Sequence, residues 1–105
     1  MVAKTVLDSV CDRLVEKFHP EKIILFGSQA RGQADEHSDV DLLVICPFTG
    51  SRRELMLQMD RALKGMRLAR DIMVMRPEEF ERDKDIPGTI ARPAFKEGVI
   101  LYERN

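Results

Sequence analysis

The amino-acid sequence predicts an α+β domain in which helices pack on a mixed β-sheet. Three observations support this fold class. Apolar residues recur at helical spacing near the N-terminus, four short apolar runs have the length of buried strands, and segments with a helical pattern lie between most of these runs. With 105 residues, the chain has the size of one domain, which we expect to extend over residues 1–105.

The first half of the sequence predicts one long helix and two strands. Apolar residues from Val2 to Phe18 follow the helical period, so we expect an amphipathic helix over residues 3–18. His19 precedes Pro20 and should end this helix, because a residue before proline is steered away from α conformation. The predicted elements that follow are a strand at 22–26, a short helical turn at 29–32 and a strand at 40–46.

The second half predicts helices alternating with two more strands. The run from Ser51 to Glu54 has the form of a capping box, which marks a helix start. Pro77 fits the first turn of another helix, and Gly98 should end the last one. The predicted elements are a helix at 51–65, a strand at 67–75, helices at 77–82 and 89–97, and a strand at 99–102.

Composition and charge restrict the classes of function. The net charge of −1 argues against a generic nucleic-acid binder, which usually carries a basic excess. Cys11 and Cys46 lie in apolar stretches without metal-ligand spacing, so we expect buried, reduced thiols. No signal peptide or membrane-spanning run is visible, which predicts a cytoplasmic protein. A chain this small should form a shallow pocket that a partner or a second copy could complete.

Two aspartates at the start of the second predicted strand are the strongest indication of chemistry. Asp39 and Asp41 are two positions apart, so on a strand they point the same way, roughly 7 Å from one another. Carboxylates held this close raise the cost of ionising each other. A divalent cation would remove that cost, which predicts a metal site.

A glycine–serine turn follows the first predicted strand. Gly27 permits close backbone approach or a positive φ, and Ser28 could donate its hydroxyl and N–H to phosphate oxygens. A Gly-Ser pair alone is more often structural. Next to a metal-binding carboxylate pair, however, it indicates phosphoryl or nucleotidyl transfer.

Asp71 is a third candidate carboxylate, at the start of an otherwise apolar strand. If that strand lies beside residues 40–46, Asp39, Asp41 and Asp71 together could hold two Mg²⁺ ions. Asp71 could then take the proton of an attacking hydroxyl. The alternative is that Asp71 only starts a strand at the surface.

Two further polar residues are weaker candidates for nucleotide binding. Arg31 could pair with a phosphate or with a carboxylate of the adjacent loop. Ser38 could contact the nucleotide, although a serine in this position more often caps a turn.

Two runs of the sequence together match a known signature: Gly27-Ser28-x-Ala30-Arg31-Gly32 and Ser38-Asp39-x-Asp41-Leu42. These runs are similar to the signature of the DNA polymerase β-like nucleotidyltransferase superfamily. The small size and the ending at Gly98–Glu103 resemble its minimal nucleotidyltransferase (MNT) branch. This resemblance implies a polymerase β palm-like fold, nucleotide binding at Gly27 and Ser28, and metal binding by the three aspartates.

The resemblance also implies a partner. Many MNT proteins resemble antitoxins that neutralise a small HEPN ribonuclease, some by adenylylating it. The leading hypothesis is therefore a nucleotidyltransferase that moves AMP from ATP to a hydroxyl of a HEPN-type toxin. Two alternatives stay open: a nucleotide-binding protein that masks its partner without turnover, and a transferase subunit for small molecules.

Overall fold

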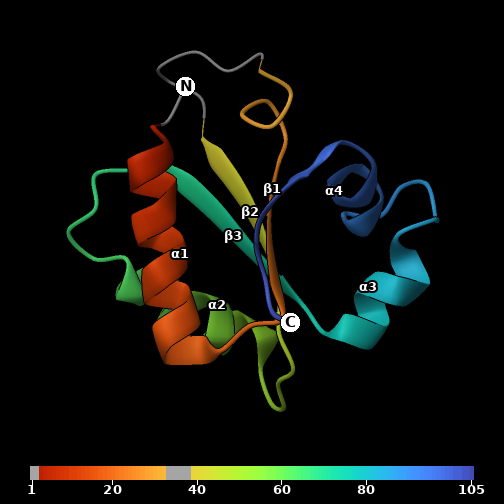
Figure 1. The fold of residues 1–105 in the computed structure, drawn as a ribbon. Coiled ribbons are helices and arrows are strands. Elements are labelled where there is room, and N and C mark those ends of the chain that lie inside the picture. The colour runs from red at the N-terminus through yellow and green to blue at the C-terminus, as the bar shows by residue number, and fades with distance from the viewer. Residues whose placement is uncertain (1–2, 33–38) are drawn as a thin grey trace.

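The computed structural model describes residues 3–32 and 39–105, and it confirms the predicted α+β class (Figure 1). Four helices pack on a four-stranded sheet in the order expected from the sequence, except that residues 28–32, where a short helical turn was predicted at 29–32, form a turn and no helix. The elements are α1 (Lys4–Phe18), β1 (Lys22–Phe26), β2 (Val40–Ile45), α2 (Arg52–Ala62), β3 (Arg70–Met75), α3 (Pro77–Asp83), α4 (Ala91–Glu97) and β4 (Val99–Glu103).

The sheet is mixed, with the strand order β3-β2-β1-β4. Strand β1 is antiparallel to both of its neighbours, β2 and β4. Strand β2 is parallel to β3 because helix α2 carries the chain back to the starting end of the sheet, as parallel pairing requires.

Helices cover both faces of the sheet (Figure 1). One core lies against α1 and α2, and the other lies against α3 and α4. Strand β2 contributes alternately to both, with Leu42 and Val44 in the first core and Leu43 and Ile45 in the second. Its continuous apolar run is therefore the pattern of a strand buried on both faces.

The two largest differences from the predicted boundaries, three residues each, both lie in the connection from α2 to β3, and α4 starts at Ala91 rather than 89. Helix α2 ends at Ala62 rather than 65, because the chain turns through Gly65 with a φ of 91°. Strand β3 begins at Arg70 rather than 67. The Arg70 guanidinium donates to the carbonyls of Met66 and Leu68, which holds the preceding segment in a bent path.

The buried thiols predicted from the sequence are confirmed. Cys11 and Cys46 are both buried and unpaired with one another. Among the helices of the described residues, none combines the length and the apolar character needed to cross a membrane.

Candidate functional site

Three strand ends meet at one end of the sheet. Strand β1 finishes there, and β2 starts there because the two are antiparallel, with Phe26 opposite Asp41. Strand β3 also starts there because it runs parallel to β2, with Asp41 opposite Asp71. The topology therefore gathers the turn after β1 and two of the predicted carboxylates at a single place.

Asp41 and Asp71 lie on the same face of the sheet. Leu43, two residues beyond Asp41, belongs to the core beneath α3 and α4, and Met73, two residues beyond Asp71, packs against that core. The two aspartates occupy paired positions on neighbouring strands, which are about 4.8 Å apart in any sheet. The structure thus brings Asp71 beside Asp41, while its role in chemistry stays a prediction.

The carboxylates at this end interact electrostatically. Asp41 is half-buried, whereas Asp39 and Asp71 are exposed. Burial raises the pKa of Asp41 above its ordinary value, and the negative charges of Asp71 and Asp39 raise it further. The Arg31 guanidinium acts in the opposite direction. The site is therefore a concentration of negative charge that one arginine offsets in part.

Gly27 is constrained by its own backbone and by Asp41. Its φ of 75° lies in the left-handed region, which side chains other than glycine rarely adopt. A Cβ added at Gly27 would overlap Oδ2 of Asp41 and would lie 3.2 Å from Cγ of that residue. The sequence predicted the positive φ as one reason for this glycine, but it did not predict the contact with the carboxylate.

The turn that follows Gly27 is closed by the backbone. The N–H of Arg31 donates to the carbonyl of Gly27 at 3.2 Å, and the N–H of Gly32 donates to the carbonyl of Gln29 at 3.4 Å. Ser28 is half-buried at the start of this turn. Gln29 is only 3% exposed, a buried polar side chain that the sequence interpretation left unassigned. Its position inside the glycine–serine turn could have indicated that Gln29 belongs to the site.

Arg31 connects the turn to helix α4. Its Nη1 lies 3.6 Å from Oε2 of Glu97 in the last turn of that helix, and both side chains are more than 40% exposed. Exposed ion pairs of this kind contribute little stability, so the pair would cost little to exchange for a phosphate. Ser38, the other weak candidate for nucleotide binding, lies outside the described residues.

A hollow of about 370 Å³ borders Asp71 on the side of helix α2. Arg53, Met56 and Leu57 contribute to its wall. Arg70, another wall residue, has a structural role, because its Nε lies 2.9 Å from Oδ1 of Asp60 in an ion pair. The hollow has mixed apolar and polar walls, and it lies on the face of the sheet opposite the one that Asp41 and Asp71 share.

The donor set fits a hard divalent cation in its chemistry. Asp41 and Asp71 are in register, Asp39 adds to the same negative field, and all of their ligand atoms are oxygens, which Mg²⁺ prefers. Over residues 3–32 and 39–105, however, no three His, Cys, Asp or Glu side chains form a ready-made metal site. The carboxylates would therefore need side-chain adjustment to share an ion.

The arrangement is that of a nucleotidyltransferase domain, and comparison with known families identifies it. Residues 9–105 match the family described as Polymerase beta, Nucleotidyltransferase. Since the match covers most of the chain, the protein belongs to this family.

A curated relative shares part of the sequence at high identity. It is a protein of Methanocaldococcus jannaschii, provisionally assigned as a protein adenylyltransferase, and it is 50% identical over 50 residues. The match covers 46% of this chain and 34% of the relative. The chain thus spans about a third of the length of that protein.

Solved structures share the fold. A protein from Sulfolobus solfataricus, provisionally assigned as a nucleotidyltransferase, aligns with a TM-score of 0.69 at 21% identity, covering 96% of this chain and 80% of its own. A toxin–antitoxin structure determined with AMP-PNP aligns with a TM-score of 0.57 at 20% identity, covering 93% and 74%. These alignments establish the fold, and they agree with the nucleotidyltransferase fold expected from the sequence.

Proposed function

We propose that this protein is a metal-dependent nucleotidyltransferase that moves AMP from ATP to a hydroxyl group of a protein partner. The observation that carries the proposal is the in-register pair of Asp41 and Asp71 beside the Gly27 turn. Membership of the polymerase beta nucleotidyltransferase family supports the reaction class. The resemblance to a provisionally assigned protein adenylyltransferase supports AMP as the group and protein as the acceptor.

The three aspartates would hold the metal. Asp41 and Asp71 would share the ions and Asp39 would complete the set. When bound, Mg²⁺ would neutralise the crowded carboxylates and stabilise the negative charge on the triphosphate. Two ions are expected, as the resemblance to the superfamily implies.

The residues of this chain have distinct roles in the proposed transfer. Backbone N–H groups of the turn at Gly27 and Ser28, with the Ser28 hydroxyl, hold the phosphates, and Arg31 exchanges Glu97 for a phosphate oxygen. The acceptor hydroxyl approaches beside the exposed Asp71. Its oxygen forms a bond to the α-phosphorus of ATP, the bond to pyrophosphate breaks, and Asp71 accepts the hydroxyl proton.

The partner we propose is a HEPN-type toxin, with this protein as its antitoxin. The fold is shared with a toxin–antitoxin structure that was determined with AMP-PNP. The net charge of −1 does not favour nucleic acid as the primary partner.

The test is a transfer assay on the protein encoded beside this one. With ATP and Mg²⁺, the wild type should add AMP to a hydroxyl side chain of that partner, detected as a mass increase. Asp71→Asn should remove the adduct while leaving AMP-PNP binding in place. Glu81→Gln, a carboxylate-to-amide change on the exposed surface of α3, is the matched control and should transfer normally. Neutralisation of the partner by Asp71→Asn without adducts would show masking instead of transfer.

A further inference from the structure

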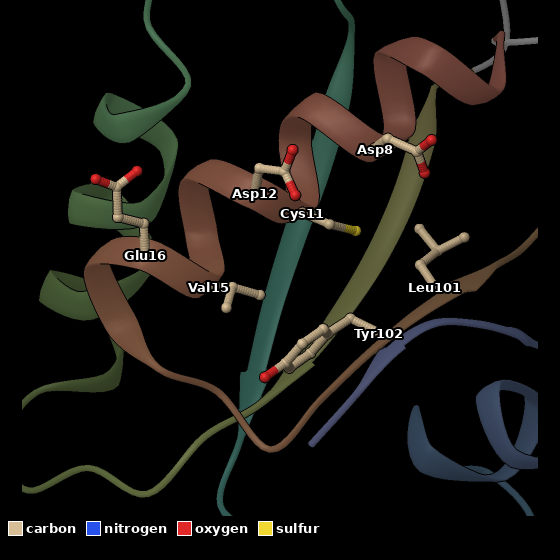
Figure 2. A pocket seen from close by; sticks show the side chains of 7 residues that line it. All are labelled: Asp8, Cys11, Asp12, Val15, Glu16, Leu101 and Tyr102. Atoms are coloured by element: carbon tan, nitrogen blue, oxygen red, sulfur yellow. The ribbon is translucent and has the colours of Figure 1, made fainter. Parts of the chain in front are cut away.

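A groove between helix α1 and strand β4 has no part in the proposed reaction (Figure 2). Its volume is about 440 Å³. Apolar atoms of Cys11, Val15 and Leu101 form its floor together with the ring of Tyr102. Strand β4 is displaced in register against β1 at this point, a β-bulge between Ile23 and Ile24. Leu101 and Tyr102 both pack against the core beneath α1 as a result.

The rim of the groove on the α1 side is acidic. Asp8, Asp12 and Glu16 follow one another at four-residue intervals, which places them on one side of the helix about 6 Å apart along its axis. Asp8 has an exposed ion pair with Lys4 at 3.4 Å, and no ion pair of Asp12 or Glu16 occurs among the residues that the structure describes. Burial raises the pKa of the Cys11 thiol to about 11, and Asp8 and Asp12 contribute to this rise.

The other rim is an edge strand. In the described part of the chain, β4 pairs with β1 alone, so its outer side presents backbone groups without strand partners. Val99 and Ile100 of this strand are 46% and 53% exposed. An apolar strand with an open edge is a site at which another strand can pair.

The spacing of the acidic row fits such a strand. Alternate residues of a β-strand are about 6.7 Å apart, close to the interval between successive acids on α1. We propose that this groove docks an extended segment of a partner protein, which adds a strand to β4. Lysine or arginine at every second position faces Asp8, Asp12 and Glu16, and the intervening apolar residues extend along the opposite face beside Ile100.

A second copy of this chain does not fit the groove. Antiparallel pairing of β4 with itself about a two-fold axis would place both α1 helices on the same face of the joined sheet. Their acidic rims would then face each other, and like charges at an interface are destabilising. The charge of the rim therefore selects a different chain with a basic segment. The proposal does not depend on the transfer reaction, because no residue of the groove belongs to the candidate site.

The direct test uses a short peptide of alternating lysine and valine as the probe, with fluorescence anisotropy for affinity. The wild type should bind it, and Asp12→Lys/Glu16→Lys should lose about tenfold or more in affinity. That variant should in turn bind a peptide of alternating glutamate and valine. The matched control, Glu78→Lys/Glu81→Lys on exposed positions of α3, carries the same change in net charge and should bind like the wild type.

Backbone amide signals of residues 99–103 locate the bound peptide in the wild type. They should shift and gain protection from hydrogen exchange when the lysine–valine peptide binds. Equal losses of affinity in the groove variant and the control would overturn the proposal, as would binding that leaves these amides unchanged. A wild-type dimer that Ile100→Lys dissociates would show that the groove serves a second copy. Each readout is independent of AMP transfer, so failure of the proposed reaction leaves this test intact.

Discussion

Two carboxylates near opposite ends of the β2–β3 pair respond to their surroundings in opposite ways. Asp41 lies at the start of β2, where burial and the charges of Asp71 and Asp39 raise its pKa. Glu79 lies in α3, just beyond the end of β3, and hydrogen bonds from the side chain of Arg52 and the backbone of Arg76 lower its pKa. One carboxylate is crowded by like charges, and the other is surrounded by donors.

The charged residues around Glu79 have structural roles. Arg52 Nη2 lies 2.6 Å from Oε2 of Glu79, and the N–H of Arg76 donates to its Oε1 at 2.8 Å. The Arg76 guanidinium carbon lies 4.2 Å from the centroid of the Phe48 ring. These contacts hold α2 against α3. A structural role therefore explains why charged side chains gather around Glu79. No comparable set of stabilising contacts explains the crowding of like charges at Asp41, and this crowding therefore indicates a ligand site.

The largest expected effect is that of Asp41→Asn. AMP transfer should fall by more than about 100-fold, since even the loss of an outer partner of a metal ligand costs up to that factor. Stability in the absence of metal should be unchanged or higher at pH 7. The raised pKa means that the folded state binds the proton more tightly, so ionisation of Asp41 lowers the stability as pH rises through its titration range.

Transfer assays and urea unfolding at pH 4 and pH 7 would check this pair of effects. A variant that is inactive because it unfolds at pH 7 would contradict the comparison, because Asp41 would then resemble Glu79.

The next effect is the destabilisation caused by Gly27→Ala. Positive φ at a residue with a side chain costs about 1–2 kcal/mol, and the overlap of the new Cβ with Asp41 adds to this. In an Asp41→Ala background the overlap is absent, so Gly27→Ala should cost less there. A double-mutant cycle of unfolding free energies measures the difference. Identical costs in both backgrounds would mean that Asp41 is not the obstacle.

A smaller effect is expected from Glu79→Gln at the paired end. The free energy of unfolding should fall by about 1 kcal/mol at pH 7. Because the folded pKa is lowered, the contribution of Glu79 is present above the ordinary pKa of a glutamate and is lost as pH falls through the folded value. The difference between wild type and variant should therefore shrink in acid, while AMP transfer at pH 7 stays normal. A loss of transfer without a loss of stability would refute the structural assignment.

The smallest effect is expected from Arg31→Gln. Its pair with Glu97 is exposed, so the free energy of unfolding should change by less than about 0.5 kcal/mol. AMP-PNP should bind about threefold more weakly by calorimetry, as one exposed charge contact is removed. Arg82→Gln, which breaks an ion pair at an exposed arginine of α3, is the control and should bind normally. Equal affinities in all three proteins would place the phosphates away from Arg31.

The sequence was most informative where local pattern alone decides the outcome. The helix and strand order followed from periodicity and from the signals at Ser51 and Pro77, and the structure confirms it. The Ser51 hydroxyl does accept from the N–H of Glu54. Spacing also predicted the aspartates at 39 and 41 as a pair.

Relations between distant segments were beyond the sequence. The strand pairing and register that put Asp71 opposite Asp41 are set by the packing of both cores, and a slip of one residue would have turned Asp71 to the other face. The contact of Gly27 with Asp41 depends on the same pairing. Arg52 and Arg70 are likewise held by acidic side chains that are distant along the chain, Glu79 and Asp60.

The parallel pairing of β2 with β3 also fixes when the candidate site can exist during folding. The antiparallel pairing of β1 and β2 alone brings Gly27 to Asp41, but Asp71 arrives only after the chain has crossed the sheet through α2. Contacts that close a long crossover form late, because the chain loses the entropy of loop closure before these contacts stabilise it. Intermediates without β3 docked would thus lack one of the two paired carboxylates. Nucleotide binding in the presence of metal would stabilise the completed fold in preference to such intermediates.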